Sequence, residues 1–233
     1  MPEPASPNRL LALLPDEERQ PLVTRAETVS LSPHEELYPT AGPIESVYFP
    51  LNVAASILID DGQGEAVEIA TIGNEGMLGS TVVLGVPYVW GRTLVPVAGT
   101  ALKLRVEILR AYLEQQPVLR TLLTRYLYAL TRHIAQAGAC HHLHSMEARC
   151  ARWLLMLQDR VGRETFVLTQ QFLSEILGVR LATVNLVLRH FKRVGLLAYV
   201  RGRIEIVDRA GLEAVSCPCY TIMTAEYQRV LAA

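Results

Sequence analysis

The chain has 233 residues, of which 50% are hydrophobic and 19% are charged, and its formal net charge is −1. This length is sufficient for two domains with hydrophobic cores, and the composition excludes a disordered or fibrous protein. Four cysteines in a chain of this length do not indicate a disulfide framework. No stretch reaches the roughly 18 apolar residues of a membrane span, and residues 1–10 lack the pattern of a secretory signal. We therefore expect a cytoplasmic protein without a membrane partner.

Charge is divided unevenly along the chain. Residues 145–209 contain 11 lysines and arginines against 6 acidic residues, whereas residues 1–144 contain 10 against 15. A basic C-terminal part beside an acidic N-terminal part predicts a polyanionic partner for the C-terminal part alone.

Residues 27–105 have the pattern of β-structure, after a short helix that we expect within residues 1–26. Runs rich in β-branched residues alternate here with glycines and other turn signals. The predicted strands are ETVSL (27–31), SVYFP (46–50), ASILIDD (55–61), AVEIAT (66–71), TVVLG (81–85), RTLVPVA (92–98) and TALKLR (100–105). DDGQGE (60–65) predicts a hairpin turn. Many short strands at this spacing indicate a β-sandwich or barrel.

The apolar period changes to that of a helix from residue 118. Apolar residues fall at 119, 122, 123, 126, 127, 130, 134 and 137, which is about five helical turns. Such a stripe is suited to packing on the chain's own domain or against a second copy of the chain. In a dimer, the contacts are assigned to Leu119, Leu123, Tyr126, Leu127, Leu130 and Ile134. A second helix is predicted over residues 146–161, with Trp153 in the core and a hinge near residues 143–145.

Residues 168–207 combine features that occur together in DNA-binding modules. LTQQFLSEIL (168–177) predicts a helix capped by Thr169, and Gly178 supplies a turn with positive φ that glycine adopts without strain. A second helix is predicted from Arg180 or Leu181, with a basic outer face. LLAYV and RIEIV predict the two strands of a hairpin around Arg201-Gly202-Arg203. Together these features indicate a winged helix-turn-helix, and the alternative is a structural helical hairpin with a solvated basic face.

This segment resembles the winged helix of the CRP/FNR transcription regulators. LTQQFLSEILGVRLATVNLVLRHFKRVGLL (168–197) is similar to their DNA-binding domain, and ESVYFP (45–50) and TIGNEGMLG (71–79) are similar to the N-terminal domain of a branch with an uncharacterised effector. The resemblance covers nearly the whole chain, because the β-rich part, the long helix and the helix-turn-helix occur in the family's order. It implies an α+β fold with a cyclic-nucleotide-binding-like β-roll (1–117), a dimerisation helix (118–144) and a winged-helix domain (145–233). It also implies a homodimer on a palindromic operator in double-stranded DNA, with RNA polymerase as a further partner.

Base readout is assigned to the turn and the first residues of the second helix. Family members usually hold polar base readers there, and the matching positions are Leu181, Ala182 and Leu186, which can contact thymine methyl groups but cannot make bidentate hydrogen bonds. We therefore assign polar readout to Arg180 and Asn185, since arginine suits guanine and asparagine suits adenine. Phosphate contacts are assigned to Thr169, Thr183, Arg189, Arg201 and Arg203.

A candidate effector pocket follows from the same resemblance. Nucleotide-binding members hold the ribose and cyclic phosphate with a Gly-Glu pair and with an arginine followed by Ser or Thr, and the guanidinium fork makes two charge-assisted bonds to a phosphate. The corresponding residues here are Glu75, Arg92 and Thr93, but the Gly-Glu element is altered to GNEGMLG and 16 residues separate Glu75 from Arg92. We expect no cofactor and an unknown small-molecule effector, with a cyclic nucleotide as the alternative.

The segment CHHLH (140–144) has the spacing of metal ligands, because Cys140 and His144 are four residues apart on one helical face. A thiol packed in a helix and imidazoles at a hinge give the same pattern without a metal. Cys217-Pro218-Cys219 lacks the two-residue spacer of common zinc or redox pairs, and no N-terminal cysteine cluster suggests an iron–sulfur centre. We assign no metal site, and a metal or haem at Cys140 and His144 stays open.

These observations predict a sequence-specific DNA-binding transcription regulator that is a dimer and is controlled through its β-domain. The alternative is a ligand-binding signalling module whose helix-turn-helix no longer binds DNA. The apolar recognition positions favour that alternative, and the wing arginines argue against it. An enzyme is not expected, because the sequence shows no paired carboxylates, nucleophile elbow, phosphate-binding glycine loop or catalytic metal motif.

Overall fold

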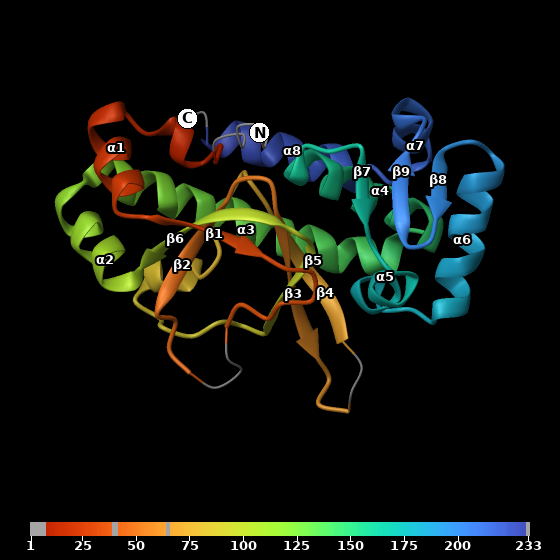
Figure 1. Ribbon diagram of the computed structural model, residues 1–233, viewed down its shortest axis with the longest axis horizontal. Coiled ribbons are helices and arrows are strands. Elements are labelled where there is room, and N and C mark those ends of the chain that lie inside the picture. The colour runs from red at the N-terminus through yellow and green to blue at the C-terminus, as the bar shows by residue number, and fades with distance from the viewer. Residues whose placement is uncertain (1–7, 39–41, 64–65, 232–233) are drawn as a thin grey trace.

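The computed structural model describes residues 8–38, 42–63 and 66–231. A β-domain and a winged-helix part lie next to each other along one long helix (Figure 1). The strands are β1 (Glu27–Leu31), β2 (Ser46–Pro50), β3 (Ala54–Asp60), β4 (Ala66–Ile72), β5 (Arg92–Val97), β6 (Gly99–Arg105), β7 (Thr165–Val167), β8 (Leu197–Val200) and β9 (Arg203–Ile206). The helices are α1 (Asp16–Thr24), α2 (Val106–Gln115), α3 (Pro117–Leu143), α4 (Met146–Val161), α5 (Gln170–Leu177), α6 (Leu181–Arg193), α7 (Arg209–Val215) and α8 (Cys219–Leu231). Two short 3-10 helices, η1 (Leu11–Leu13) and η2 (Ser80–Leu84), complete the set.

The β-domain consists of two three-stranded antiparallel sheets, with strand orders β1-β6-β2 and β4-β3-β5. β-Branched and aromatic residues dominate these strands, and their inward side chains, such as Phe49, Ile72 and Val95, are buried in one core. Residues 64 and 65 of the predicted hairpin turn lie outside the described residues. The strands on either side of that turn pair as expected, with Asp60 opposite Ala66.

One predicted strand is wrong. TVVLG (81–85) is β-branched, but residues 80–84 form the 3-10 helix η2. Gly79 and Gly85 flank it, both with a φ of 77°, so the chain turns sharply at each end and cannot run straight. The other six predicted strands are confirmed within two residues.

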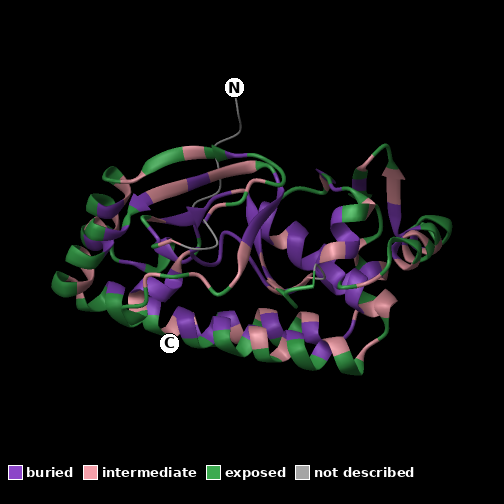
Figure 2. Ribbon diagram, turned by 90° about the horizontal axis from the view of Figure 1, so that it is seen from below, coloured by how far each residue is buried: buried purple, intermediate pink, exposed green. Residues whose placement is uncertain are grey.

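The long helix α3 begins with Pro117 at its first position, where the missing amide hydrogen costs nothing. Its apolar stripe faces the β-domain and α8 of the same chain (Figures 1 and 2). Five of the six residues assigned to a dimer interface are 0–7% exposed, and Ile134 packs on the same core; the six are Leu119, Leu123, Tyr126, Leu127, Leu130 and Ile134. They are therefore core residues of this chain, buried without a second copy.

The winged-helix part follows a sharp break after α3. Ser145 caps α4 by accepting a hydrogen bond from the Ala148 amide at 3.3 Å, and Gly162 ends α4 in the left-handed conformation. The strands β7, β9 and β8 form a small antiparallel sheet, of which β8 and β9 are the predicted wing. Strand β7 and the helices α2, α7 and α8 were not individually predicted from the sequence.

The C-terminal helix α8 leaves the winged helix and lies along α3 (Figure 1). Met223 and Ala137 share one small buried cluster, and Tyr227 packs on Tyr126 and His133 of α3. The last helix of the predicted winged-helix domain (145–233) is therefore packed on α3.

The β-domain and the winged helix are packed together through a common buried cluster. It contains Leu58 and Leu94 of the β-domain together with Trp153 of α4 and Phe172 of α5. Trp153 is 1% exposed, which confirms its predicted place in the core. In the described part of the chain no single helix is long and apolar enough to cross a membrane; the bent pair α5 and α6 passes by length and composition only.

Candidate nucleic-acid interface

The helix-turn-helix is formed by α5 and α6. Thr169 caps α5 by accepting a hydrogen bond from the Phe172 amide at 3.1 Å, and Gly178 makes the turn with a φ of 62°. The inner face of α6 is anchored by Val184, Leu188 and Phe191, which are 0–2% exposed. The outer face of α6 is consequently held at the surface in a fixed orientation.

The residues assigned to base readout lie together at the start of α6. Arg180 is the exposed residue immediately before the helix, Ala182 is exposed, and Leu181 and Leu186 are 39% and 62% exposed. Asn185 is half-buried, and its Oδ1 is buried with no hydrogen-bond partner among the described residues. A bidentate contact with adenine needs that oxygen to face the groove, so Asn185 has to rotate to read a base.

The residues assigned to phosphate contacts fall into two groups. Arg189 on α6 is exposed, and Thr183 is half-buried. The wing turn presents Arg201 and Arg203, both exposed, and Arg201 and Gly202 take positive φ values of 50° and 80°. Thr169 is exposed but already uses its hydroxyl to cap α5. The wing arginines therefore flank the tight turn and project at its tip, as predicted.

Burial changes the charge balance inferred from the sequence. Three of the eleven cations in residues 145–209, namely Arg149, Arg152 and Arg160, are 4–9% exposed and add nothing to a surface. Six of the exposed cations are grouped on α6, the turn before it and the wing: Arg180, Arg189, Lys192, Arg193, Arg201 and Arg203. The basic character of this part of the surface is thus concentrated on the face that carries the helix-turn-helix and wing.

Two buried polar contacts join α4 to the β-domain. Arg160 Nε lies 2.7 Å from Glu75 Oε1, and the side chains are 6% and 11% exposed. Burial alone would lower the pKa of Arg160, but the Glu75 carboxylate outweighs it and the pKa is raised. The Trp153 indole donates to both carboxylate oxygens of Glu68, at 2.9 and 3.1 Å. Burial raises the pKa of Glu68, although hydrogen bonds from this indole and from Thr71 oppose it.

The three residues assigned to an effector pocket do not line one of the described cavities together. Glu75 is used in the ion pair with Arg160. Arg92 is half-exposed and lies 3.9 Å from Glu36 and 3.5 Å from Glu175 of α5. Thr93 is buried and lines a small cavity that Glu75 and Arg92 do not line. The departure of GNEGMLG from the family's Gly-Glu element already spoke against a nucleotide pocket. Nothing in the sequence indicated that Glu75 and Arg92 pair with residues of the winged-helix part.

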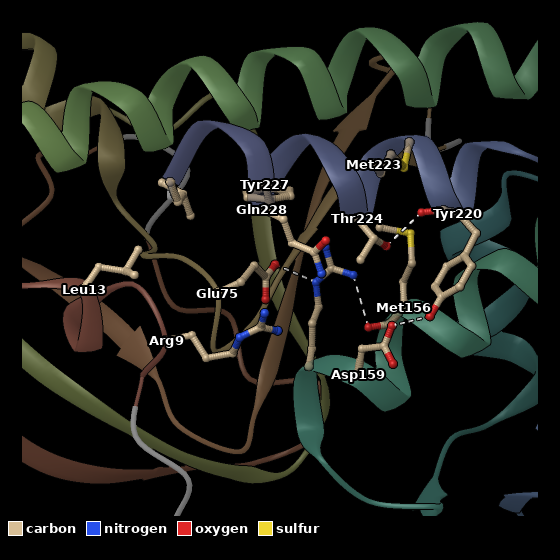
Figure 3. A pocket seen from close by; sticks show the side chains of 12 residues that line it. Arg9, Leu13, Glu75, Met156, Asp159, Tyr220, Met223, Thr224, Tyr227 and Gln228 are labelled. Carbon is tan, nitrogen blue, oxygen red and sulfur yellow. Dashed lines mark hydrogen bonds and ion pairs between the residues drawn. The ribbon is translucent and has the colours of Figure 1, made fainter. Parts of the chain in front are cut away.

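A larger cavity lies where η1, the loop after β4, α4 and α8 meet (Figure 3). Its volume is about 500 Å³. Glu75 and Arg9 line one side, Asp159 and Met156 come from α4, and Tyr227 comes from α8 (Figure 3). A molecule bound here would touch both the β-domain and the winged-helix part.

A cluster of metal-ligating side chains lies at the hinge between α3 and α4. Cys140, His144, Cys217 and Cys219 have their ligand atoms all within 4.8 Å of one another. The sequence indicated the first two by their spacing, but the Cys-Pro-Cys segment was set aside because of its one-residue spacer. His133 and Cys150, which also lie near this hinge in the sequence, are not members of the cluster.

Residues 148–215 match the family model of the Crp-like helix-turn-helix domain. A CRP-family transcriptional regulator from Thermus thermophilus is similar in structure, with a TM-score of 0.65, 17% identity, and coverage of 81% of this chain and 96% of that one. FixK2 from Bradyrhizobium japonicum gives a TM-score of 0.64, 16% identity and coverage of 82% and 98%. The c-di-GMP-responsive global regulator CLP from Xanthomonas campestris gives 0.63, 10% identity and coverage of 83% and 100%. No curated protein matches the chain.

The fold defines a class of proteins in which a β-domain is joined by a long helix to a winged helix-turn-helix. Within that class, the chain carries a Crp-like helix-turn-helix domain and has the architecture of the CRP/FNR transcriptional regulators, as the resemblance in its sequence implied.

Proposed function

We propose that this protein is a sequence-specific DNA-binding transcription regulator that acts on chromosomal DNA in the cytoplasm. The observation that carries the proposal is the exposed outer face of α6 beside the wing, with six exposed cations on these elements. Cations on such a face neutralise phosphates, while side chains at the start of the helix reach base edges in the major groove. The match to the Crp-like helix-turn-helix domain supports the same assignment.

The dimer is proposed to form along the outer face of α3. Exposed residues recur there at intervals of four and three, namely Thr124, Tyr128, Thr131, Ala135, Gly138 and His142. This is the spacing of a coiled-coil seam, and its small side chains allow two helices to approach closely. A symmetric pair would present two recognition helices to half-sites about 34 Å apart, which implies a palindromic operator.

Control by a small molecule is proposed to act at the contact between the β-domain and the winged helix. The cavity of about 500 Å³ adjoins the Glu75–Arg160 ion pair, so an occupant would bear on that contact directly. An effector shifts DNA binding only by its different affinity for the two arrangements of the domains. A cyclic nucleotide at Arg92 is not favoured, because that cation faces two carboxylates instead of an open anion site.

The test is DNA binding by the full-length protein, measured by fluorescence anisotropy at two salt concentrations. The probe is a duplex selected by the protein from random DNA. Arg180→Ala is expected to cost about 1–3 kcal/mol on this site and to relax its sequence preference. Arg203→Ala is expected to weaken binding to all duplexes alike and to reduce the salt slope by about 1.

Arg110→Ala is the matched control, because Arg110 is an exposed cation on α2, at the far end of the molecule from α6 (Figure 1). The Arg110→Ala variant should bind the DNA probe with the same affinity as the unaltered protein. If no selected or random duplex is bound in a salt-dependent manner, with or without cyclic AMP, the alternative of a signalling module with a vestigial helix-turn-helix is supported instead.

A further inference from the structure

The cluster at the hinge brings together residues that are distant in sequence. Cys140 lies in the last turn of α3, and His144, four residues later, is the residue that ends the helix. Cys217 and Cys219 lie at the junction of α7 and α8, more than 70 residues later. All three cysteines are buried and His144 is half-buried.

Two distances within the cluster are close to those between neighbouring ligands of a tetrahedral metal site. Cys140 Sγ lies 3.5 Å from Cys217 Sγ, and Cys219 Sγ lies 3.6 Å from His144 Nδ1. Zinc bonds of about 2.3 Å to sulfur and 2.0–2.1 Å to nitrogen place neighbouring ligand atoms roughly 3.5–3.8 Å apart. The four ligand atoms all lie within 4.8 Å of one another, so one ion could reach all four.

The charges around the cluster favour a centre with net negative charge. Arg152 is 4% exposed and interacts electrostatically with the thiols of Cys140 and Cys217. Among the described residues no carboxylate lies within ion-pair distance of Arg152. Its Nε has no hydrogen-bond partner there, and its Nη1 donates to the sulfurs of Met156 and Met223. A buried cation without a close counter-ion is costly. Three thiolates, one neutral imidazole and Zn²⁺ sum to −1, which would supply that counter-ion.

One of the sulfurs also has a hydrogen-bond donor beside it. Gln136 Nε2 donates to Cys219 Sγ at 3.1 Å, as an outer-shell group does for a metal-bound sulfur. Cys219 is the first residue of the 13-residue helix α8, where the helix dipole stabilises negative charge.

We propose that Cys140, His144, Cys217 and Cys219 bind one structural zinc ion, which fixes the start of α8 to the end of α3. A closed site of three sulfurs and one nitrogen is a known ligand set for structural zinc. Zinc binding by the four ligands holds together the hinge between the β-domain and the winged helix. The inference is independent of DNA binding, because it rests on a separate part of the molecule.

The test is the metal content of the full-length protein, purified without a polyhistidine tag and with a reductant. Elemental analysis should find about one zinc ion per chain. After removal of zinc, binding of cobalt(II) should produce the visible absorption of a tetrahedral cobalt–thiolate site, which the zinc form lacks. Cys219→Ser and His144→Ala should lose zinc to a chelator that the unaltered protein resists, and Gln136→Ala should weaken affinity roughly 10-fold or more.

Two matched controls separate ligands from their neighbours. Cys150 is a buried cysteine outside the cluster, and His142 is an exposed histidine two residues from His144. Cys150→Ala and His142→Ala should keep about one zinc ion per chain. In the unaltered protein, thiol alkylation mapped by mass spectrometry should reach Cys140, Cys217 and Cys219 together once a chelator is added, which tests the site even if a variant fails to fold.

Several results would overturn the proposal. One is unaltered protein that holds no zinc after purification and takes up none from equimolar Zn²⁺. Others are a Cys140–Cys217 disulfide in place of a metal, an iron–sulfur absorption spectrum, or full zinc retention by Cys219→Ser and His144→Ala.

Discussion

Removing the charge of Glu75 should loosen the attachment of the winged helix to the β-domain. As whole residues, Arg160 and Glu75 are 5% and 8% exposed, and the Glu75 carboxylate is the ion-pair partner of the Arg160 guanidinium. Glu75→Gln keeps the shape of the side chain but leaves a buried cation unpaired. Two unit charges 4 Å apart interact by about 4 kcal/mol at an effective dielectric constant of 20, and breaking a buried pair typically costs about 3–5 kcal/mol. We expect Glu75→Gln to lower the free energy of unfolding by about 3–5 kcal/mol.

The assay is urea unfolding followed by tryptophan fluorescence, since Trp153 is buried at this contact. The matched control is Glu107→Gln, the same substitution in the exposed Arg105–Glu107 pair, where the loss should stay below about 1 kcal/mol. A double-mutant cycle of Glu75→Gln with Arg160→Met should show a coupling energy of about 1–3 kcal/mol. The reasoning is refuted if Glu75→Gln costs no more than Glu107→Gln, or if the cycle is additive.

Three further outcomes are expected. If the proposed dimer forms along α3, Ala135→Arg should give a monomer in light scattering with unchanged circular dichroism, whereas Ala111→Arg on exposed α2 should not. A dimeric Ala135→Arg protein would exclude the α3 seam. Burial lowers the pKa of His133, and the charges of Arg160 and Arg152 lower it further. As the pH falls, the unfolded chain therefore binds a proton at His133 before the folded chain does. The free energy of unfolding should fall below about pH 6.5, by up to about 1.4 kcal/mol per pH unit. His133→Leu should reduce this slope, and an unchanged slope contradicts the assignment. Burial raises the pKa of Glu68, so the ionised carboxylate costs stability as the pH rises above about 4.3. Glu68→Gln should therefore gain stability relative to the unaltered protein between pH 4 and 7, and a constant difference would count against a buried ionised group.

The local chemistry of the chain was sufficient to predict the helix-turn-helix and wing. Thr169 caps α5, Gly178 makes the turn, and apolar residues at helical spacing give α6 its buried face. Each of these features depends on residues within a few positions of one another, so the sequence contains all the information that they require. The same holds for the glycine-punctuated strands of the β-domain. The strand predicted over TVVLG (81–85) is wrong because Gly79 and Gly85 turn the chain at both ends, although the residues between them favour a strand.

Long-range relations were decided by the tertiary structure. An apolar stripe such as that of α3 says only that a face is buried, and α8 and the β-domain of the same chain turned out to cover it. A charge count cannot show that Arg152 and Arg160 lie inside the molecule. Spacing indicated a pocket at Glu75 and Arg92, but each side chain faces a different partner in the winged-helix part.

The hinge cluster shows the same division most clearly. The sequence by itself indicated Cys140 and His144 as a pair, because positions four residues apart come to the same side of a helix. In the structure His144 is the residue that ends α3, one turn after Cys140. Only the tertiary structure decided that Cys217 and Cys219 meet them, because this depends on the path of more than 70 intervening residues and on α8 returning to α3. The physical reason is that backbone geometry propagates over a few residues, whereas the partner of a buried group is selected by the packing of the whole chain.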